Sequence, residues 1–62
     1  MRKYKIIFYF LDKNGFAETH EDGSIKYNDE IIQAYNAGEA VSRLKDMCEQ
    51  EPEISSVIIV EE

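Results

Sequence analysis

The first clear pattern is at residues 4–11, where β-branched and aromatic side chains follow one another almost without interruption. The run Tyr-Lys-Ile-Ile-Phe-Tyr-Phe-Leu contains almost no helix-favouring residues, and this composition is typical of a β-strand. Apolar side chains would point to both faces of that strand. Strands buried on both faces usually lie inside a sheet, so the pattern predicts a central strand.

Two turn signals follow this strand. In Asp12-Lys13-Asn14-Gly15, the Asn-Gly pair tolerates the positive φ angles of a tight reversal, so we expect the chain to turn there. Residues 16–23 alternate only weakly and end in a second signal, Asp22-Gly23. This stretch is expected to form either a short edge ribbon or an ordered loop, and the sequence leaves both open.

Residues 24–35 predict a second strand, although a helix competes with it. The apolar positions are Ile25, Tyr27, Ile31, Ile32 and Tyr35. As a strand, the segment would be broken near Asn28–Asp29. In the helical alternative, Asn28 caps a helix that continues to Gln50, with three of the apolar positions on one face. The next segment favours the strand.

Residues 37–50 have the strongest helical pattern in the chain. Asn36 precedes them and Glu39 follows three residues later, a variant of the capping box that marks a new helix start. The residues that form one apolar stripe at helical spacing are Ala37, Ala40, Val41, Leu44, Met47 and Cys48. Glu51-Pro52-Glu53 should end the helix, because proline disfavours helical backbone at the residue before it.

Residues 54–60 predict the last strand, and the order strand, strand, helix, strand restricts the topology. A reversal between the first two strands makes them antiparallel, whereas the helix acts as a crossover that makes the second and third strands run the same way. The first strand then lies between them. We therefore predict a single α+β domain over residues 1–62, a small β-β-α-β fold with strand order 2-1-3 and one amphipathic helix packed on one sheet face.

Composition limits what such a domain can hold. With 62 residues, 44% of them hydrophobic, it buries only about 60% of the surface that its unfolded chain exposes, which leaves little room for a deep pocket. The single cysteine, Cys48, excludes an intrachain disulfide and fits a reducing cytoplasm. No stretch approaches the roughly 20 apolar residues of a membrane helix. We expect a soluble cytoplasmic protein with no membrane partner.

One sheet face is expected to remain uncovered, because a single helix covers only one side. The residues predicted to face the helix are Tyr4, Ile6, Phe8, Phe10, Ile32 and Ala34. Alternation then sends the following residues to the other side: Ile7, Tyr9, Leu11, Ile31 and Tyr35. Either Ile58 with Val60 or Val57 with Ile59 would join them. An exposed apolar patch of a few hundred Å² usually marks a binding site. The alternative is that residues 12–28 fold back and cover this face as part of the core.

Charge is distributed unevenly around a net value of −6. Residues 1–28 carry five basic and four acidic side chains, whereas residues 29–62 carry two basic and nine acidic ones. The acids near the helix C-terminus are disfavoured by the helix dipole; they are Asp46, Glu49, Glu51 and Glu53. They would form either a surface that docks on a basic partner or a solvated face that keeps the protein soluble. The negative charge repels phosphate, so we expect no direct nucleic-acid binding.

Catalytic and metal-binding signals are weak. His20 is the only imidazole, and with Glu21 and Asp22 it shows no recognisable ligand spacing. Cys48 lies on the apolar stripe of the helix, where a thiol is normally an inert core residue. We therefore expect no enzymatic activity, no metal and no cofactor.

These features favour a non-enzymatic protein–protein interaction module, either an adaptor or an inhibitor. The run Ala-Tyr-Asn-Ala-Gly-Glu-Ala at residues 34–40 resembles that of many small bacterial and phage proteins, which implies a phage or another mobile element as the source. The alternative is an acidic nucleic-acid mimic that inhibits a nucleic-acid-binding enzyme. A weak homodimer, face to face or edge to edge, is also expected. The predicted partner-binding residues are Ile7, Tyr9, Leu11, Ile31, Tyr35, Asp46, Glu49 and Glu53.

Overall fold

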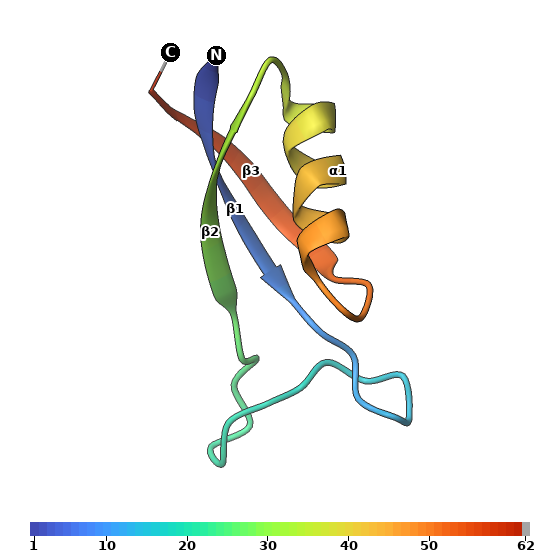
Figure 1. Ribbon diagram of the computed structural model, residues 1–62. Helices are drawn as coiled ribbons and strands as arrows, with labels where there is room; N and C mark the ends of the chain where they lie inside the picture. The colour runs from blue at the N-terminus through green and yellow to red at the C-terminus, as the bar shows by residue number, and fades with distance from the viewer. Residues whose placement is uncertain (62) are drawn as a thin grey trace.

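The computed structural model describes residues 1–61, and of Glu61 the backbone only. Its elements are strand β1 (Arg2–Tyr9), strand β2 (Asn28–Ala34), helix α1 (Ala37–Met47) and strand β3 (Glu53–Glu61) (Figure 1). The strands form one sheet in the order β2-β1-β3, and the helix lies on one side of it. This confirms the predicted α+β fold and strand order.

Strand β1 pairs antiparallel with both of its neighbours. Its Tyr4 lies opposite Ile32 of β2 and Ile59 of β3. Strands β2 and β3 therefore run in the same direction on either side of β1, as the helical crossover requires. The β1–β3 register shifts at two places, where Ser55 and Val60 are extra residues on β3. Such bulges interrupt the regular ladder and increase the local twist.

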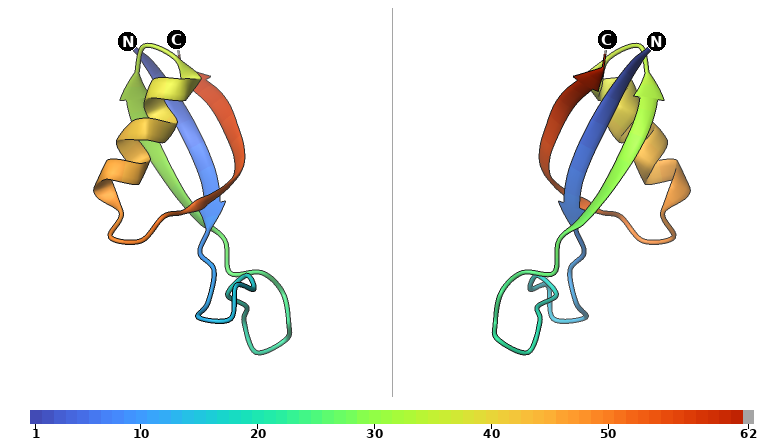
Figure 2. Two further views of the ribbon diagram at one scale, coloured as in Figure 1. Left: turned by 90° about the vertical axis from the view of Figure 1, so that its right-hand side faces the viewer. Right: turned by 90° about the vertical axis from the view of Figure 1, so that its left-hand side faces the viewer.

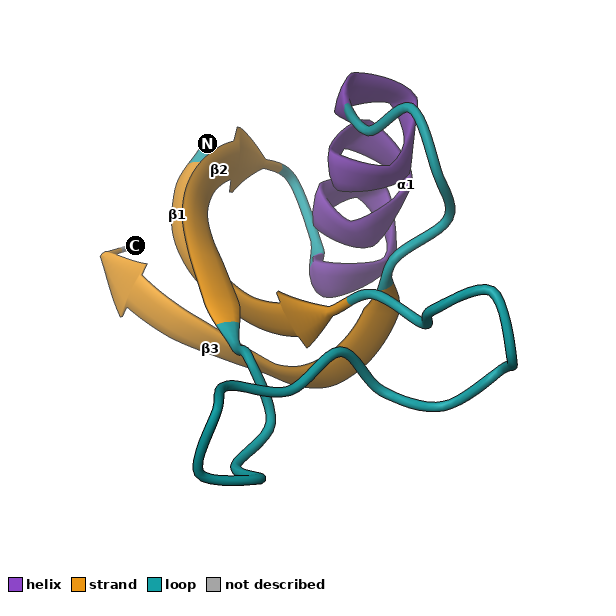
Figure 3. Ribbon diagram, turned by 90° about the horizontal axis from the view of Figure 1, so that it is seen from below, coloured by secondary structure: helices purple, strands orange, loops and turns teal. Residues whose placement is uncertain are grey.

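The core lies between the sheet and the helix, on the inner side of the curled strands (Figure 3). Its buried side chains are Tyr4, Ile6, Phe8, Ile32, Ala34, Ala40 and Leu44. The predicted β1 alternation is confirmed, because every second residue of that strand is buried. Phe10 follows the strand, is half-buried, and packs edge to face on Phe8 with ring centroids 5.6 Å apart.

The start of α1 confirms a new helix and excludes a continuous helix from Asn28. The Glu39 N–H donates to Asn36 Oδ1 at 2.8 Å, and the Tyr35 N–H donates to Glu39 Oε1 at 3.1 Å. The returning bond thus reaches the residue before the cap, a small departure from the standard capping box. The first of these bonds satisfies one of the backbone donors that the first helical turn leaves unpaired.

The helix ends three residues before the predicted Gln50. Cys48 has an extended backbone, and its N–H donates to the Lys45 carbonyl at 3.3 Å, which closes the last turn. The predicted stripe is also wrong at Met47 and Ala37, which are both exposed. The other stripe residues, Ala40, Val41, Leu44 and Cys48, are buried in the core or packed against it.

Residues 10–27 form an arm that extends from the end of the sheet (Figures 1 and 2). The predicted turn at Asn14-Gly15 is present: the Gly15 N–H donates to the Asp12 carbonyl at 3.0 Å, and Gly15 has a φ of 84°. The Asp12 carboxylate also accepts from the backbone N–H groups of Asn14 and Phe16. This turn belongs to the arm and does not join β1 directly to β2.

The second half of the arm is an ordered loop with one isolated bridge between Thr19 and Ile25 and no strand, so the ordered loop is the alternative that the structure adopts. The His20 N–H donates to the Ser24 carbonyl at 2.8 Å, and Gly23 takes a φ of 90° at the predicted turn. The hydroxyl and N–H of Ser24 both donate to the Asp22 carboxylate. These two bonds favour the charged carboxylate and hold the pKa of Asp22 below its ordinary value.

The arm also explains why two predicted strand boundaries are wrong. The first strand ends at Tyr9, not at Leu11, because Leu11 bridges to Ala17 within the arm. The second strand begins at Asn28, not at Ser24, because Ile25 bridges to Thr19. Local partners in the arm thus replace the sheet pairing that apolar alternation alone suggested.

Candidate functional site

The sheet side opposite α1 is the candidate site, and we call it the open face. Residues paired across the strands point to the same side, so the β1 residues that alternate with the buried ones define it. Lys5 lies opposite Ile31 and Ile58, and Tyr9 lies opposite Glu53. The open face consists of Lys3, Lys5, Ile7, Tyr9, Asp29, Ile31, Gln33, Glu53, Ser56 and Ile58.

Apolar side chains flank Lys5 on the open face. Ile31 is 52% exposed and Ile58 is 47% exposed, one on each side of Lys5, and Ile7 is half-buried beside them. The structure thus places the predicted residues Ile7, Tyr9 and Ile31 together. It also selects Ile58, and not Val57 with Ile59, for this side of β3.

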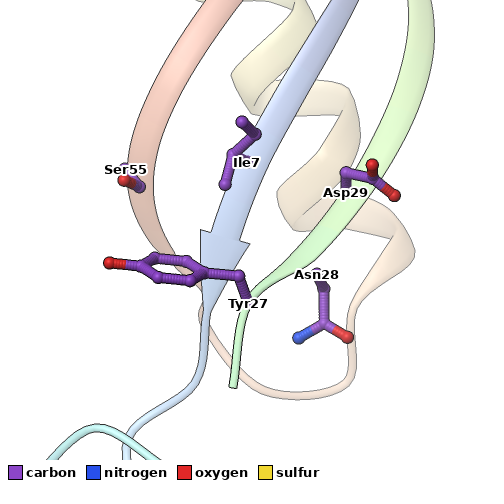
Figure 4. Close-up of a pocket in the computed structure, with 5 residues that line it drawn as sticks. All are labelled: Ile7, Tyr27, Asn28, Asp29 and Ser55. Carbon is purple, nitrogen blue, oxygen red and sulfur yellow. The ribbon is translucent and has the colours of Figure 1, made fainter. Parts of the chain in front are cut away.

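A shallow hollow of about 640 Å³ lies at the arm end of the open face. Its lining residues are Ile7, Tyr27, Asn28, Asp29 and Ser55 (Figure 4). Tyr27 reaches this place from the arm, and its ring meets that of Tyr9 edge to face at 5.9 Å. Sequence reasoning missed Tyr27 as a site residue, because it assigned the tyrosine to a strand and could not foresee the course of the arm.

The arm does not cover the open face. It continues beyond the end of the sheet, and the molecule measures 37 × 21 × 12 Å along its principal axes (Figure 2). Within residues 1–61, the ring contact between the arm and the open face is that of Tyr27 with Tyr9. The alternative in which residues 12–28 fold back as a lid is therefore wrong, and Ile31 and Ile58 remain accessible to solvent.

Two of the predicted apolar site residues lie outside the open face. Leu11 is in the arm, where its carbonyl accepts a 3.3 Å bond from the Gln50 side chain, so the predicted alternation ends before it. Tyr35 is exposed just beyond β2, in the connection to α1.

The predicted acidic residues do not form one surface. Glu53 lies on the open face opposite Tyr9, whereas Asp46 belongs to α1 on the other side of the sheet and the exposed Glu49 follows that helix. Lys45 and Glu51 form an exposed ion pair at 3.6 Å. The acids are therefore divided between the two sides of the molecule.

A second hollow, of about 510 Å³, lies between β2 and α1. Its lining residues are Ile31, Ile32, Gln33, Arg43, Asp46 and Met47. Asp46 and Ile31 thus meet at the outer margin of β2, although they belong to different sides of the sheet. Arg43 is held by an ion pair with Glu39 at 3.3 Å, one helical turn away.

Residues with catalytic potential are separated. His20 is exposed on the arm, and Cys48 is half-buried against the core, as its place on the apolar stripe predicts. Within residues 1–61, no group of three or more His, Cys, Asp or Glu side chains is arranged to hold a metal ion. None of the helical structure described here has the length and apolarity needed to cross a membrane.

Comparison of the chain with protein-family models, curated proteins and solved structures gives no match.

Proposed function

We propose that this protein is a non-enzymatic protein-binding module that binds its partner through the open face. The observation that carries this proposal is the uncovered position of Ile31 and Ile58, about half exposed on either side of β1. Apolar surface left in water is unfavourable, and contiguous patches of it mark interaction sites on soluble proteins.

The arrangement around these side chains favours a protein partner over a small molecule. Lys5 and Asp29 form an exposed ion pair at 3.7 Å, and Glu53 lies farther along the same face. Protein interfaces as a whole contain about as much polar area as the rest of the surface, so charged groups among apolar side chains fit such an interface. Small-molecule sites, in contrast, enclose most of the ligand surface, and the hollow beside Tyr27 is shallow.

We further propose that the module acts as an adaptor or inhibitor in the cytoplasm. Cys48 is its only cysteine and is a free thiol, which fits a reducing compartment. An adaptor or inhibitor needs an accessible surface and no reactive group, and the open face meets that requirement.

The test is capture of a partner from a lysate of the source cells by immobilised protein and two lysine variants. Ile31→Lys replaces an exposed apolar side chain of the open face with a charge and should abolish capture. Phe16→Lys is the matched control, because Phe16 is 72% exposed but lies on the arm. The partner should remain bound to the Phe16→Lys variant and to the unmodified protein.

Salt distinguishes this interface from acidic mimicry. An apolar contact should survive 0.5 M salt, where the Debye length falls to about 4 Å, whereas electrostatic binding should be lost. Capture that disappears at high salt would support a nucleic-acid mimic and contradict the proposal. Equal capture by the Ile31→Lys variant and the unmodified protein would also contradict it.

A further inference from the structure

Strand β3 is an edge strand with exposed apolar side chains on both of its faces. It pairs with β1, and no other described strand lies beside it. Ile58, Ile59 and Val60 are 47%, 47% and 48% exposed. An edge strand also presents backbone N–H and C=O groups that can pair with a further strand.

The composition of β3 is that of an interior strand. Residues 54–60, Ile-Ser-Ser-Val-Ile-Ile-Val, contain no charged residue. Exposed edge strands of soluble proteins usually carry charged side chains that oppose pairing with a further strand. β1, which is also rich in apolar residues, does have two neighbours. The sequence of β3 therefore fits a strand with one more partner than the single chain supplies.

Helix α1 also leaves much of the helix-facing side of β3 uncovered. It packs mainly against β2 and less against β3 (Figure 2). Ile59 faces the helix side, since it lies opposite the buried Tyr4, yet about half of its surface remains exposed. A strand added beside β3 would cover Ile59 on one face and Ile58 on the other.

We propose that this strand is β3 of a second copy of the chain, paired antiparallel about a two-fold axis to give a continuous six-stranded sheet. Like charges oppose self-association of a chain with a net charge of −6. The uncharged segment at residues 54–60 lets two copies approach without placing a charge at the contact. A symmetric contact also buries the same exposed residues twice.

The bulges and the side-chain alternation determine the register of this pairing. The bulges at Ser55 and Val60 leave Ser56–Ile59 as the regular segment. Directly opposed residues must point to the same face. The two-fold axis must therefore pass between one residue and the same residue of the second copy. An axis at Ile58 pairs it with its own copy and pairs Val57 with Ile59. An axis at Val57 would instead pair the polar Ser56 with Ile58, which buries less apolar surface.

The interface is small, so the dimer is weak and depends on concentration. Each copy contributes a few half-exposed side chains and a short ladder, less than the roughly 800 Å² per partner of a standard interface. Pairing at this edge covers Ile58, which also belongs to the open face, but leaves Ile31 and the β2 side of that face accessible. The dimer therefore does not depend on the partner proposed above.

The test compares two isoleucine-to-lysine variants of similar exposure by analytical ultracentrifugation up to about 1 mM, which populates even weak dimers. Ile59→Lys, on the helix side of β3, should weaken the dimer at least about tenfold, because two buried charges would face apolar neighbours. Ile31→Lys is the control on the other edge strand and should leave the dimerisation constant unchanged. Circular dichroism checks that both variants are folded.

A second measurement needs no variant. In a mixture of isotope-labelled and unlabelled protein, nuclear Overhauser contacts between Val57 of one copy and Ile59 of the other are expected. A monomer at about 1 mM would overturn the proposal, as would a dimer without these contacts. A dimer lost only in the Ile31→Lys variant would be a face-to-face dimer and would also overturn it. A failure to capture a partner from the lysate would contradict the proposed function but not the β3 dimer.

Discussion

The two edges of the sheet differ in the features that control strand pairing. β2 carries Asp29, Glu30 and Gln33 as exposed residues, and Asp29 is paired with Lys5. β3 carries no charge between Glu53 and Glu61, and its exposed residues there include the branched apolar Ile58, Ile59 and Val60. Charged side chains on an edge oppose the addition of another strand. Position at an edge thus does not by itself determine whether a strand is protected against pairing with a further strand.

A single pair of residues shows how the helix adds to this difference. Ile32 of β2 and Ile59 of β3 both lie opposite Tyr4 and face the helix side. Ile32 is 6% exposed and Ile59 is 47% exposed. The two isoleucines differ because α1 packs mainly over β2. The core is therefore displaced to one side of the sheet.

The largest expected effect comes from truncating these two isoleucines. Ile32→Ala removes a buried side chain and should lower the free energy of unfolding by about 2–5 kcal/mol. Ile59→Ala should cost about half as much or less, because half of the side chain is already in water. Urea unfolding at low protein concentration measures both values without a contribution from dimerisation. Equal losses would show that the helix protects both strands alike.

A smaller effect is expected at the helix start, beside the end of β2. Asn36→Ala removes the acceptor of the Glu39 N–H and should lower the free energy of unfolding by about 1 kcal/mol. Asn36→Ser retains a capping oxygen and is the matched control. Thermal unfolding followed by circular dichroism compares the two variants. A serine variant as unstable as the alanine variant would argue that the side-chain cap contributes little.

The smallest change in stability should follow removal of the charges from β2. Asp29→Val with Glu30→Val, in the Ile59→Lys background, should change the free energy of unfolding by less than about 1 kcal/mol, since the Lys5–Asp29 pair is exposed. Self-association should nevertheless return, now through β2. The matched control is Asp29→Asn with Glu30→Gln, which keeps polar side chains there. Light scattering that shows monomers of the valine variant would contradict the role given to these acids.

The sequence predicts the arrangement of the elements well because each signal is local or follows from connectivity. The two-faced apolar run at residues 4–11 indicates a central strand, and Asn36 with Glu39 marks the break between strand and helix. Together with the crossover, these signals are sufficient for the order β2-β1-β3. The same alternation also places Ile7, Tyr9 and Ile31 on one face.

The features that sequence reasoning missed depend on tertiary placement. No local signal specifies that Leu11 and Ile25 pair within the arm, or that Tyr27 returns to Tyr9. The displacement of α1 toward β2 is likewise a property of packing between elements. The apolar pattern predicts that Ile58 and Ile59 point to opposite faces, but it does not show that both remain half exposed.

The pairing of β1 with β3 also affects how the protein folds. Tyr4 and Ile59 lie near opposite ends of the chain, and the arm separates β1 from β2 as well. Contacts between distant residues slow folding, because chain entropy is lost before the contacts form. During synthesis, β1 emerges first and stays without its β3 neighbour until nearly the whole domain has been made. The most apolar strand, β1, thus lacks its second neighbour until synthesis of the domain is nearly complete. Aggregation competes with folding during that interval.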